Sequence, residues 1–504
     1  MSARAWWRLA WAVWLAAIPL RLAFFAGYGL GDDTIFFRAG LNAVITGHLN
    51  VADPNVSRLG MSIPQMLAFR ILPVNDFSFV LPTFAFALGT HAASLFLARD
   101  LLGARGALLT SAFFLTSPYE TLTATAFAPD YIVAFWTLLA VLGCWRGQLS
   151  GRRRPMALAG VALACALFSK TSALLALPVF GLATLASARR WRGWVAFWGA
   201  FGASVVAGSL LFKVLGQSPL HWYLNRAGGQ PGGHDVTAML GPTLAIYPRY
   251  LFLREPDYGD WMFGVTGWMA MLGVLAALWG ARTERWRGPS RVVLLCFIGL
   301  LLLEFAPHKL DFHAYYSHPR IFRYLAQVSA LVYLSAAFSV EVLLGAHTRA
   351  LRAGAVALAL AAWGFGLWEA PRVSEPSWDA NRDGRALSRF FHDHPPAAPA
   401  TVQSDYWHCY RLEDINNDQH LELRCPLRNT REEKEEFLAS IHEGYVVTGG
   451  GRVAWYSTRS WALDLSDAGF TPPPTWHLLF ERDGPVKPWR REPLRVWRVE
   501  ETAG

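Results

Sequence analysis

Two adjacent carboxylates, Asp32 and Asp33, directly follow the first apolar segment of the chain, which runs from Trp6 to Gly29. If that segment crosses a bilayer, both acids emerge where a membrane-bound substrate presents its polar head. A carboxylate in this position can act as general base for an acceptor hydroxyl or amine, or bind a metal. Bulky apolar neighbours argue against a freely solvated turn. We therefore take both acids as candidate catalytic residues, and Arg38 in the same stretch as a candidate for lining their cavity.

Three cations are candidates for binding a phosphate. Lys170 is the only charged residue between Arg154 and Arg189, and a charge at membrane depth is costly enough to suggest a function. Arg320 and Arg323 are three residues apart, on one face of the helix that they begin, so they can clamp a phosphate together. Snorkelling of Lys170 and a basic, aromatic belt around the arginines would explain the same residues without binding.

Further polar residues fall in the same predicted loops. The candidates for lining a shared cavity are Tyr119, Glu120, Asp130, His313, His318 and Tyr324. Asp130 directly precedes an apolar segment, where an acid also stabilises a helix N-terminus without any further function. Zinc is conceivable at His308, His313 and Asp311, but these residues form no compact ligand motif. We assign no metal ligand and require no cofactor, and leave a divalent metal open.

The composition is that of a membrane protein. Hydrophobic residues make up 53% of the 504 residues and charged residues only 16%, and the 23 Trp fit anchoring at the membrane interface. The net charge is +9, but no basic segment is free of hydrophobic neighbours. Orientation of loops in the membrane explains this charge, so we expect membrane lipid as a partner and no nucleic acid.

Apolar runs near the length of a membrane span recur eleven times. They lie at 6–28, 79–98, 106–118, 128–145, 156–168, 172–188, 193–215, 261–281, 291–306, 322–345 and 353–370. If all eleven cross, every arginine-dense short loop lies on one face, as the positive-inside rule requires. Merging 106–145 or 156–188 into one long helix would break this pattern. We therefore predict a cytoplasmic N-terminus and a C-terminus on the outside.

This orientation predicts an all-α polytopic membrane protein with a small extracytoplasmic α/β C-terminal domain. Residues 1–370 form the transmembrane, catalytic part, and 29–78 form a first outer loop with helices in the membrane interface. Residues 371–504 form the soluble domain, in which Cys409 and Cys425 can pair if it lies outside the cytoplasm. Its strand-like runs are 445–447, 476–480 and 494–499.

Several of these motifs resemble those of one enzyme superfamily. They are Asp32 to Phe36 followed by Gly47, Leu102 to Leu109, Ser117-Pro118 with Asp130, Ser169 to Leu174, and His318-Pro319-Arg320 through Tyr324. This set resembles the GT-C glycosyltransferases, in the branch of protein O-mannosyltransferases and undecaprenyl-phosphate-aminoarabinose transferases. The sequence departs from the branch at Asp33 and Phe36, where its motif has Glu and Tyr.

The resemblance implies a bacterial inner-membrane enzyme with a periplasmic C-terminal domain. It would move one sugar from a polyprenyl-phosphate-linked donor to an acceptor lipid, glycan or protein, with inversion. Asp32 would then be the base, while Lys170, Arg320 and Arg323 bind the carrier phosphate. The alternative is a transporter or flippase of a lipid-linked saccharide. Transporters usually place charges near the midplane and show paired halves, whereas these charges lie at the predicted outer boundary and no halves repeat.

Overall fold

The structure is a computed structural model of the whole chain. It describes residues 1–27, 32–52, 56–126, 128–187, 191–222, 246–253, 261–305, 307–309, 316–317, 325–396, 400–405, 408–409, 412, 421–425, 430–450, 463–484 and 492–500. The chain forms two compact units. The helical unit comprises Met1–Phe24, Ala39–Pro73 and Val80–Val373, and the sheet unit comprises Phe25–Arg38, Val74–Phe79 and Ser374–Gly504. A boundary between two domains at residue 371 stays a prediction, because α16 (Arg349–Asp393) runs through it without a break.

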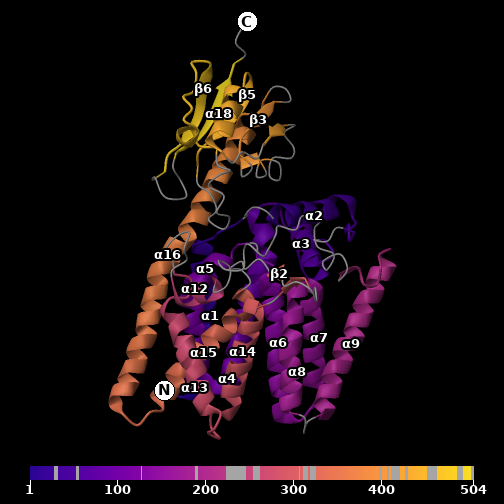
Figure 1. The fold of residues 1–504 in the computed structure, drawn as a ribbon, viewed down its shortest axis with the longest axis vertical. Helices are drawn as coiled ribbons and strands as arrows, with labels where there is room; N and C mark the ends of the chain where they lie inside the picture. Colours follow the sequence, from indigo (N-terminus) through magenta and orange to yellow (C-terminus); the bar gives the residue numbers. More distant parts are fainter. Residues whose placement is uncertain are drawn as a thin grey trace. The chain divides into compact units, whose positions relative to one another are not determined.

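Most of the helical unit consists of helices, from single short turns to long apolar helices. They are α1 (Ala3–Ala23), α3 (Leu59–Ile71), α5 (Pro118–Thr123), α6 (Asp130–Ser150), α7 (Arg153–Ser169), the 3-10 helix η1 (Thr171–Leu175), α8 (Ala176–Ala186), α9 (Trp191–Val214), α12 (Ile246–Phe252), α13 (Val265–Gly280), α14 (Arg287–Phe305) and α15 (Ala326–Leu344). Two further helices, α2 (Asp32–Thr46) and α4 (Asp76–Thr116), contribute residues to both units. In Figure 1, α7 lies between α6 and α9, and it packs against both. A short antiparallel pair, β1 (Pro307–Lys309) and β2 (Tyr316–Ser317), precedes α15.

Five of the described helices are long and apolar enough to cross a membrane. They are α4, α6, α9, α15 and α16, and two shorter apolar stretches lie at Thr171–Ala186 and Val265–Gly280. These helices support a multi-pass membrane protein, but the predicted count of eleven spans is not confirmed.

Helix α4 contains a sharp turn at Gly103. The φ of Gly103 is 82°, a left-handed value that glycine adopts without the steric cost of a side chain. This turn separates the apolar runs 79–98 and 106–118. Just beyond it, the Arg105 guanidinium donates to both carboxylate oxygens of Glu341 in α15, with the Nε bond at 2.7 Å. The second half of α4 is thereby tied to α15.

Helices α7 and α8 are separated by a bend at Lys170, which has an extended backbone with φ −162° and ψ 138°. Helix α3 packs directly on this bend, because a Cβ added at Gly60 would lie 2.0 Å from Ser169 Oγ and 3.1 Å from Ser169 Cα. Apolar side chains hold the same region together. They are Val51, Leu59, Leu167, Phe212 and Trp222. The segment after α2 is thus fixed against the end of α7.

The sheet unit contains a five-stranded mixed sheet in the order β4-β3-β5-β7-β6. Its strands are β3 (Thr401–Gln403), β4 (Glu422–Arg424), β5 (Gly444–Thr448), β6 (Trp476–Arg482) and β7 (Leu494–Val499). Strand β3 is parallel to β4 and β5, whereas β7 is antiparallel to β5 and β6. The three predicted strands are confirmed as β5, β6 and β7.

Two short helices and one disulfide complete the sheet unit. Helix α18 (Arg431–Ala439) begins with a capping box of Thr430 and Glu433, and α19 (Leu465–Ala468) packs against it. Cys409 and Cys425 form a disulfide. Because its partners are 16 residues apart in sequence, the bond closes a short loop of the chain between β3 and β5.

Candidate functional site

Lys170, the only charged residue between Arg154 and Arg189, forms a buried ion pair. Lys170 Nζ lies 2.8 Å from Oδ1 and 3.0 Å from Oδ2 of Asp130, the first residue of α6. The two side chains are 8% and 0% exposed. The bend after α7 and the start of α6 are therefore joined through charge, 40 residues apart in sequence.

A side chain from α15 completes this cluster. The Gln327 amide nitrogen donates to Asp130 Oδ1 and to Ser172 Oγ, both at 2.8 Å. Gln327 lies in the first turn of α15 and Ser172 lies in η1. The Lys170 cluster, which we define as Lys170, Asp130, Gln327 and Ser172, thus connects three elements of the helical unit.

The energetic demands on this pair are high. Burying two charges has a large desolvation cost, which is offset only by close geometry and by hydrogen bonds to the remaining polar atoms. The 2.8 Å contacts of Asp130 to Lys170 and Gln327 provide that geometry. Removing one member of such a pair leaves an uncompensated charge and typically costs about 3–5 kcal/mol. Hydrophobic residues of similar volume could pack these helices together without the desolvation cost of two charges. We therefore infer that the ion pair has a role beyond helix packing.

A second buried polar cluster lies on α1, α5 and α6. The Tyr131 hydroxyl donates to Glu120 Oε2 at 2.5 Å and lies 2.6 Å from Thr123 Oγ1. Arg21 Nη2 lies 3.9 Å from the same Glu120 oxygen, and both of these side chains are fully buried. We call Arg21, Glu120, Thr123 and Tyr131 the Glu120 cluster.

Charge and burial act in opposite directions on Glu120. Burial raises the pKa of the Glu120 carboxyl because it disfavours the ionised form, and the positive charge of Arg21 partly opposes this. The Arg21 guanidinium lies 5.2 Å from the centre of the Phe114 ring. Among the described residues, none accepts a hydrogen bond from it. Arg21 therefore interacts with Glu120 through charge and with Phe114 through a cation–π contact.

The two clusters are connected through the first turn of α6. Asp130 belongs to the Lys170 cluster and Tyr131, the next residue, to the Glu120 cluster. Helix α15 contacts this region a second time, because the Tyr333 hydroxyl donates to Ser117 Oγ at 2.7 Å. The first turn of α6 is thus fixed by side-chain contacts of Asp130 in one cluster and of Tyr131 in the other.

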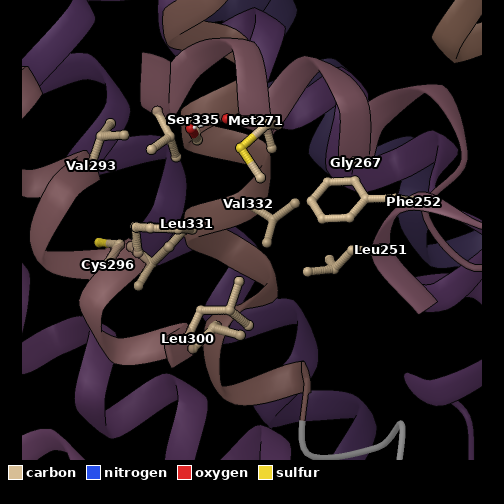
Figure 2. Close-up of a pocket in the computed structure, with 14 residues that line it drawn as sticks. Leu251, Phe252, Gly267, Met271, Val293, Cys296, Leu300, Leu331, Val332 and Ser335 are labelled. Carbon is tan, nitrogen blue, oxygen red and sulfur yellow. Dashed lines mark hydrogen bonds between the residues drawn. The ribbon is translucent and has the colours of Figure 1, made fainter. Parts of the chain in front are cut away.

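An apolar pocket opens among α12, α13, α14 and α15 (Figure 2). It encloses about 440 Å³ of empty space, including the part that is open to the surface. Its walls include Phe252, Met271, Leu300 and Val332, which Figure 2 shows grouped around one cavity. The Ser335 hydroxyl, which also lines the pocket, donates a hydrogen bond to the Ala270 carbonyl oxygen at 2.8 Å. Val328 also lines the pocket, so α15 carries pocket residues directly after Gln327.

The structure brings some of the predicted site residues together. Asp130 and Lys170 form one ion pair, and Glu120 lies in the adjoining cluster. Tyr119 is fully buried and stacks on Phe263 with ring centres 4.8 Å apart. The direct pairing of Lys170 with Asp130 was not predicted.

The other predicted residues are less fully described. Arg38 is half-buried in α2. Asp32 and Asp33 begin α2, but their side chains lie outside the described part of the structure. Five predicted residues also lie outside the described residues, namely His313, His318, Arg320, Arg323 and Tyr324. Within the described ranges, no group of three His, Cys, Asp or Glu side chains is placed to hold a metal ion.

Five residues of the two clusters were not among the predicted site residues, namely Arg21, Thr123, Tyr131, Ser172 and Gln327. Arg21 had a usable signal, since it is a charge inside an apolar segment. Tyr131 and Gln327 have no such signal in the sequence, because single polar residues at the start of apolar helices are common. Their partners are also too distant in sequence to be recognised.

Comparison with known protein families finds a match in the first half of the chain. Residues 62–214 match the family described as dolichyl-phosphate-mannose-protein mannosyltransferase. The match covers less than a third of the chain, so it shows that this part resembles the family that the sequence motifs also resemble. The predicted resemblance is confirmed. No curated protein sequence matches the chain.

Two solved structures share the fold at low sequence identity. The chain is 13% identical to ArnT from Cupriavidus metallidurans in the apo state, with a TM-score of 0.55 over 99% of both chains. It is 14% identical to the Archaeoglobus fulgidus oligosaccharyltransferase in complex with Zn and sulfate, with a TM-score of 0.51. That match covers 92% of this chain and 70% of the archaeal one. The shared architecture therefore includes nearly the whole chain.

Proposed function

We propose that the protein transfers a single sugar from a polyprenyl-phosphate-linked donor to an acceptor outside the cytoplasm. The observation that carries this proposal is the GT-C fold over 99% of the chain, combined with a family match whose description names dolichyl-phosphate-mannose, a polyprenyl-phosphate sugar. The acceptor is a lipid, a glycan or a protein. We further propose a bacterial inner-membrane location with a cytoplasmic N-terminus and an outside C-terminus.

The helical unit offers surfaces for both parts of such an amphiphilic donor. The pocket among α12 to α15 is lined by apolar side chains and suits part of an isoprenoid chain. The first turn of α15 carries Gln327 of the Lys170 cluster, and the next residue, Val328, lines the pocket. Helix α15 therefore carries residues of both features, and we propose that the pocket holds part of the isoprenoid tail while Lys170 binds the phosphate.

The ion pair supports a role for Lys170 in binding the donor phosphate. Polyprenyl phosphate leaves as an anion, and a cation fixed beforehand stabilises developing charge without reorganisation at the moment of reaction. Asp130 fixes the Lys170 ammonium by contacts of 2.8 and 3.0 Å. In this proposal Asp130 is a positioning residue, and Arg320 and Arg323 are further phosphate ligands.

The proposed base is Asp32, with Asp33 as its neighbour. An acceptor hydroxyl must lose its proton as it attacks the anomeric carbon, and a carboxylate can accept that proton. The bond from the sugar to the phosphate oxygen breaks as the new glycosidic bond forms, so direct displacement inverts the anomeric configuration. The electron pair leaves with the carrier phosphate, toward the proposed cations.

The decisive experiment measures transfer of radiolabelled sugar from a polyprenyl-phosphate donor by the purified full-length protein. We expect Asp32→Asn to lower turnover by at least 100-fold, in line with the usual range for a general base of about 10²–10⁴. Lys170→Met should both raise the donor KM and lower kcat, because Lys170 is proposed to bind the donor phosphate and to stabilise its developing charge. Full turnover in both Asp32→Asn and Asp33→Asn would refute the proposed base, and an unchanged donor KM in Lys170→Met would refute the phosphate role.

A further inference from the structure

Helix α13 presents an apolar stripe on its exposed face. The stripe consists of Trp268, Leu272, Leu275 and Trp279, and each of these side chains is 45% to 64% exposed. Their spacings of four, three and four residues place them along one line of the helix. The opposite face is buried, is lined by small residues such as Gly273, and packs on α15. The stripe therefore faces away from the neighbouring helix and is suited to contact with hydrocarbon chains.

The apolar stripe ends in a compact cationic turn. Arg282 follows Trp279 by three residues and so continues the line of the stripe. Backbone hydrogen bonds close the turn, from Arg282 N to the Trp279 carbonyl at 3.2 Å and from Arg287 N to the Thr283 carbonyl at 3.0 Å. We define the α13–α14 arginine cluster as Arg282, Arg285, Arg287 and Arg291, all of which are exposed.

One member of this cluster is held in place by aromatic rings. The Arg285 guanidinium carbon lies 4.6 Å from the centre of the Trp286 ring. Trp286 in turn packs edge-on against Phe338 of α15, with ring centres 5.5 Å apart, and Phe338 is fully buried. Stacking uses the flat face of a guanidinium, whereas its N–H groups point outward in the plane and can bind an anion. The position of Arg285 is therefore fixed before any ligand binds.

The positive charge of the arginine cluster exceeds the negative charge around it. Glu284 is the only acidic residue from 281 to 303, against four arginines. Among the described residues, none of the four arginines has a carboxylate within 4 Å, and the ion pairs of the helical unit use other cations. The cluster is thus available for an external anion.

We propose that the α13–α14 arginine cluster binds the headgroup of an anionic phospholipid whose acyl chains lie along the apolar stripe of α13. Guanidinium groups pair with phosphate oxygens in a fixed planar geometry, and clusters of basic residues at the ends of membrane helices recognise anionic headgroups. Trp279 lies where the stripe meets the cluster, which is the position that tryptophan favours at a membrane interface. One amphiphile therefore matches both features. The proposal requires that the helical unit lies in a bilayer, but not that it transfers a sugar.

The phosphate of the proposed sugar donor does not account for this cluster. Trp286 contacts Phe338, which follows Gln327 of the Lys170 cluster by eleven residues in α15. At the rise of an α-helix, these two positions are about 16 Å apart. A donor phosphate at Lys170 therefore cannot contact the arginine cluster as well, so the cluster requires a second anionic group.

The test measures lipid binding to the purified full-length protein in detergent by native mass spectrometry. The probes are phosphatidylglycerol, phosphatidylcholine with the same acyl chains, and inorganic phosphate. We expect the unaltered protein to bind phosphatidylglycerol more tightly than phosphatidylcholine. The variant R282Q/R285Q should lower the affinity for phosphatidylglycerol by roughly 10- to 30-fold, because each arginine beside an anionic headgroup contributes roughly fivefold.

The matched control is R153Q/R154Q. It removes two exposed arginines at the start of α7, in another loop on the same predicted cytoplasmic face. Because arginines in such loops also orient a membrane protein without binding a particular lipid, this variant measures the contribution of general loop charge. We expect it to change the affinity by less than about twofold. Thermal unfolding without added lipid checks that both double variants are folded.

Three results would overturn the proposal. The first is equal affinity of the unaltered protein for phosphatidylglycerol and phosphatidylcholine. The second is an equal loss in both double variants, which would reduce the cluster to ordinary loop charge. The third is displacement of phosphatidylglycerol by an equal concentration of inorganic phosphate, which would assign the cluster to a soluble anion. Because the measurement needs neither donor nor transfer, each of these results would leave the proposed function standing.

Discussion

At the scale of single residues, the central feature is the mutual dependence of Lys170 and Asp130. Each neutralises a charge that would otherwise be buried alone. Lys170→Met should therefore destabilise the protein by about 3–5 kcal/mol, while Lys170→Met/Asp130→Asn should lose less than the sum of the single variants. We expect a coupling energy of about 0.5–3 kcal/mol, measured by thermal unfolding in detergent. Additive losses would show that the two side chains do not stabilise each other.

Glu120 gives a prediction about pH. Because burial raises the pKa of Glu120 in the folded protein, the folded state keeps this proton at pH values where the unfolded chain has released it. The stability that the protonated carboxyl provides is complete below the unfolded pKa, about 4.3, and decreases as the pH rises toward the folded pKa. The variant Glu120→Gln cannot titrate. The difference in apparent Tm between Glu120→Gln and the unaltered protein should therefore shift in favour of the variant as the pH rises from 4 to 8. If the two plots of Tm against pH are parallel, the pKa of Glu120 is not raised.

At the scale of elements, the contact of α3 with the bend at Lys170 depends on a missing side chain. A Cβ at Gly60 would overlap Ser169, so Gly60→Ala must push α3 away from the bend. We expect a loss of about 1–3 kcal/mol, the usual cost of overpacking, measured by thermal unfolding. The control is Gly199→Ala in α9, where a Cβ meets nothing within 4 Å. That substitution should be neutral or stabilising by up to about 1 kcal/mol, and equal behaviour of both variants would contradict the close approach.

Most of the helices and some of the strands could be predicted from the sequence. Apolar runs and alternating patterns depend on local residues, so the helices α6, α7 and α15 and the strands β5 to β7 were predictable. The turn at Gly103 has a local cause as well, because glycine tolerates its φ of 82°. The break between α7 and α8 was expected because one long helix over 156–188 would violate the positive-inside pattern of the arginine-dense loops. Short strands such as β3 and β4, with three residues each, carry too little pattern to be predicted.

Partners within the site were not predictable, for a physical reason. Asp130 and Lys170 are 40 residues apart, and Gln327 is 197 residues from Asp130. Such contacts depend on how helices pack, which hydrophobic periodicity does not specify. The sequence therefore indicated which residues are unusual, and the fold determined that Lys170 faces Asp130.

At the scale of the whole molecule, the orientation of the chain is testable through its cysteines. If the C-terminal domain lies outside the cytoplasm, Cys409 and Cys425 form their disulfide there, where oxidising conditions favour it. Intact cells treated with a mild reductant should then bind a membrane-impermeant maleimide at Cys425, which is partly exposed, whereas Cys409 is buried. A variant with both replaced by Ser should not be labelled, because Cys144, Cys165 and Cys296 lie in apolar helices. Labelling that appears only after the membrane is permeabilised would place the domain in the cytoplasm and reverse the proposed topology.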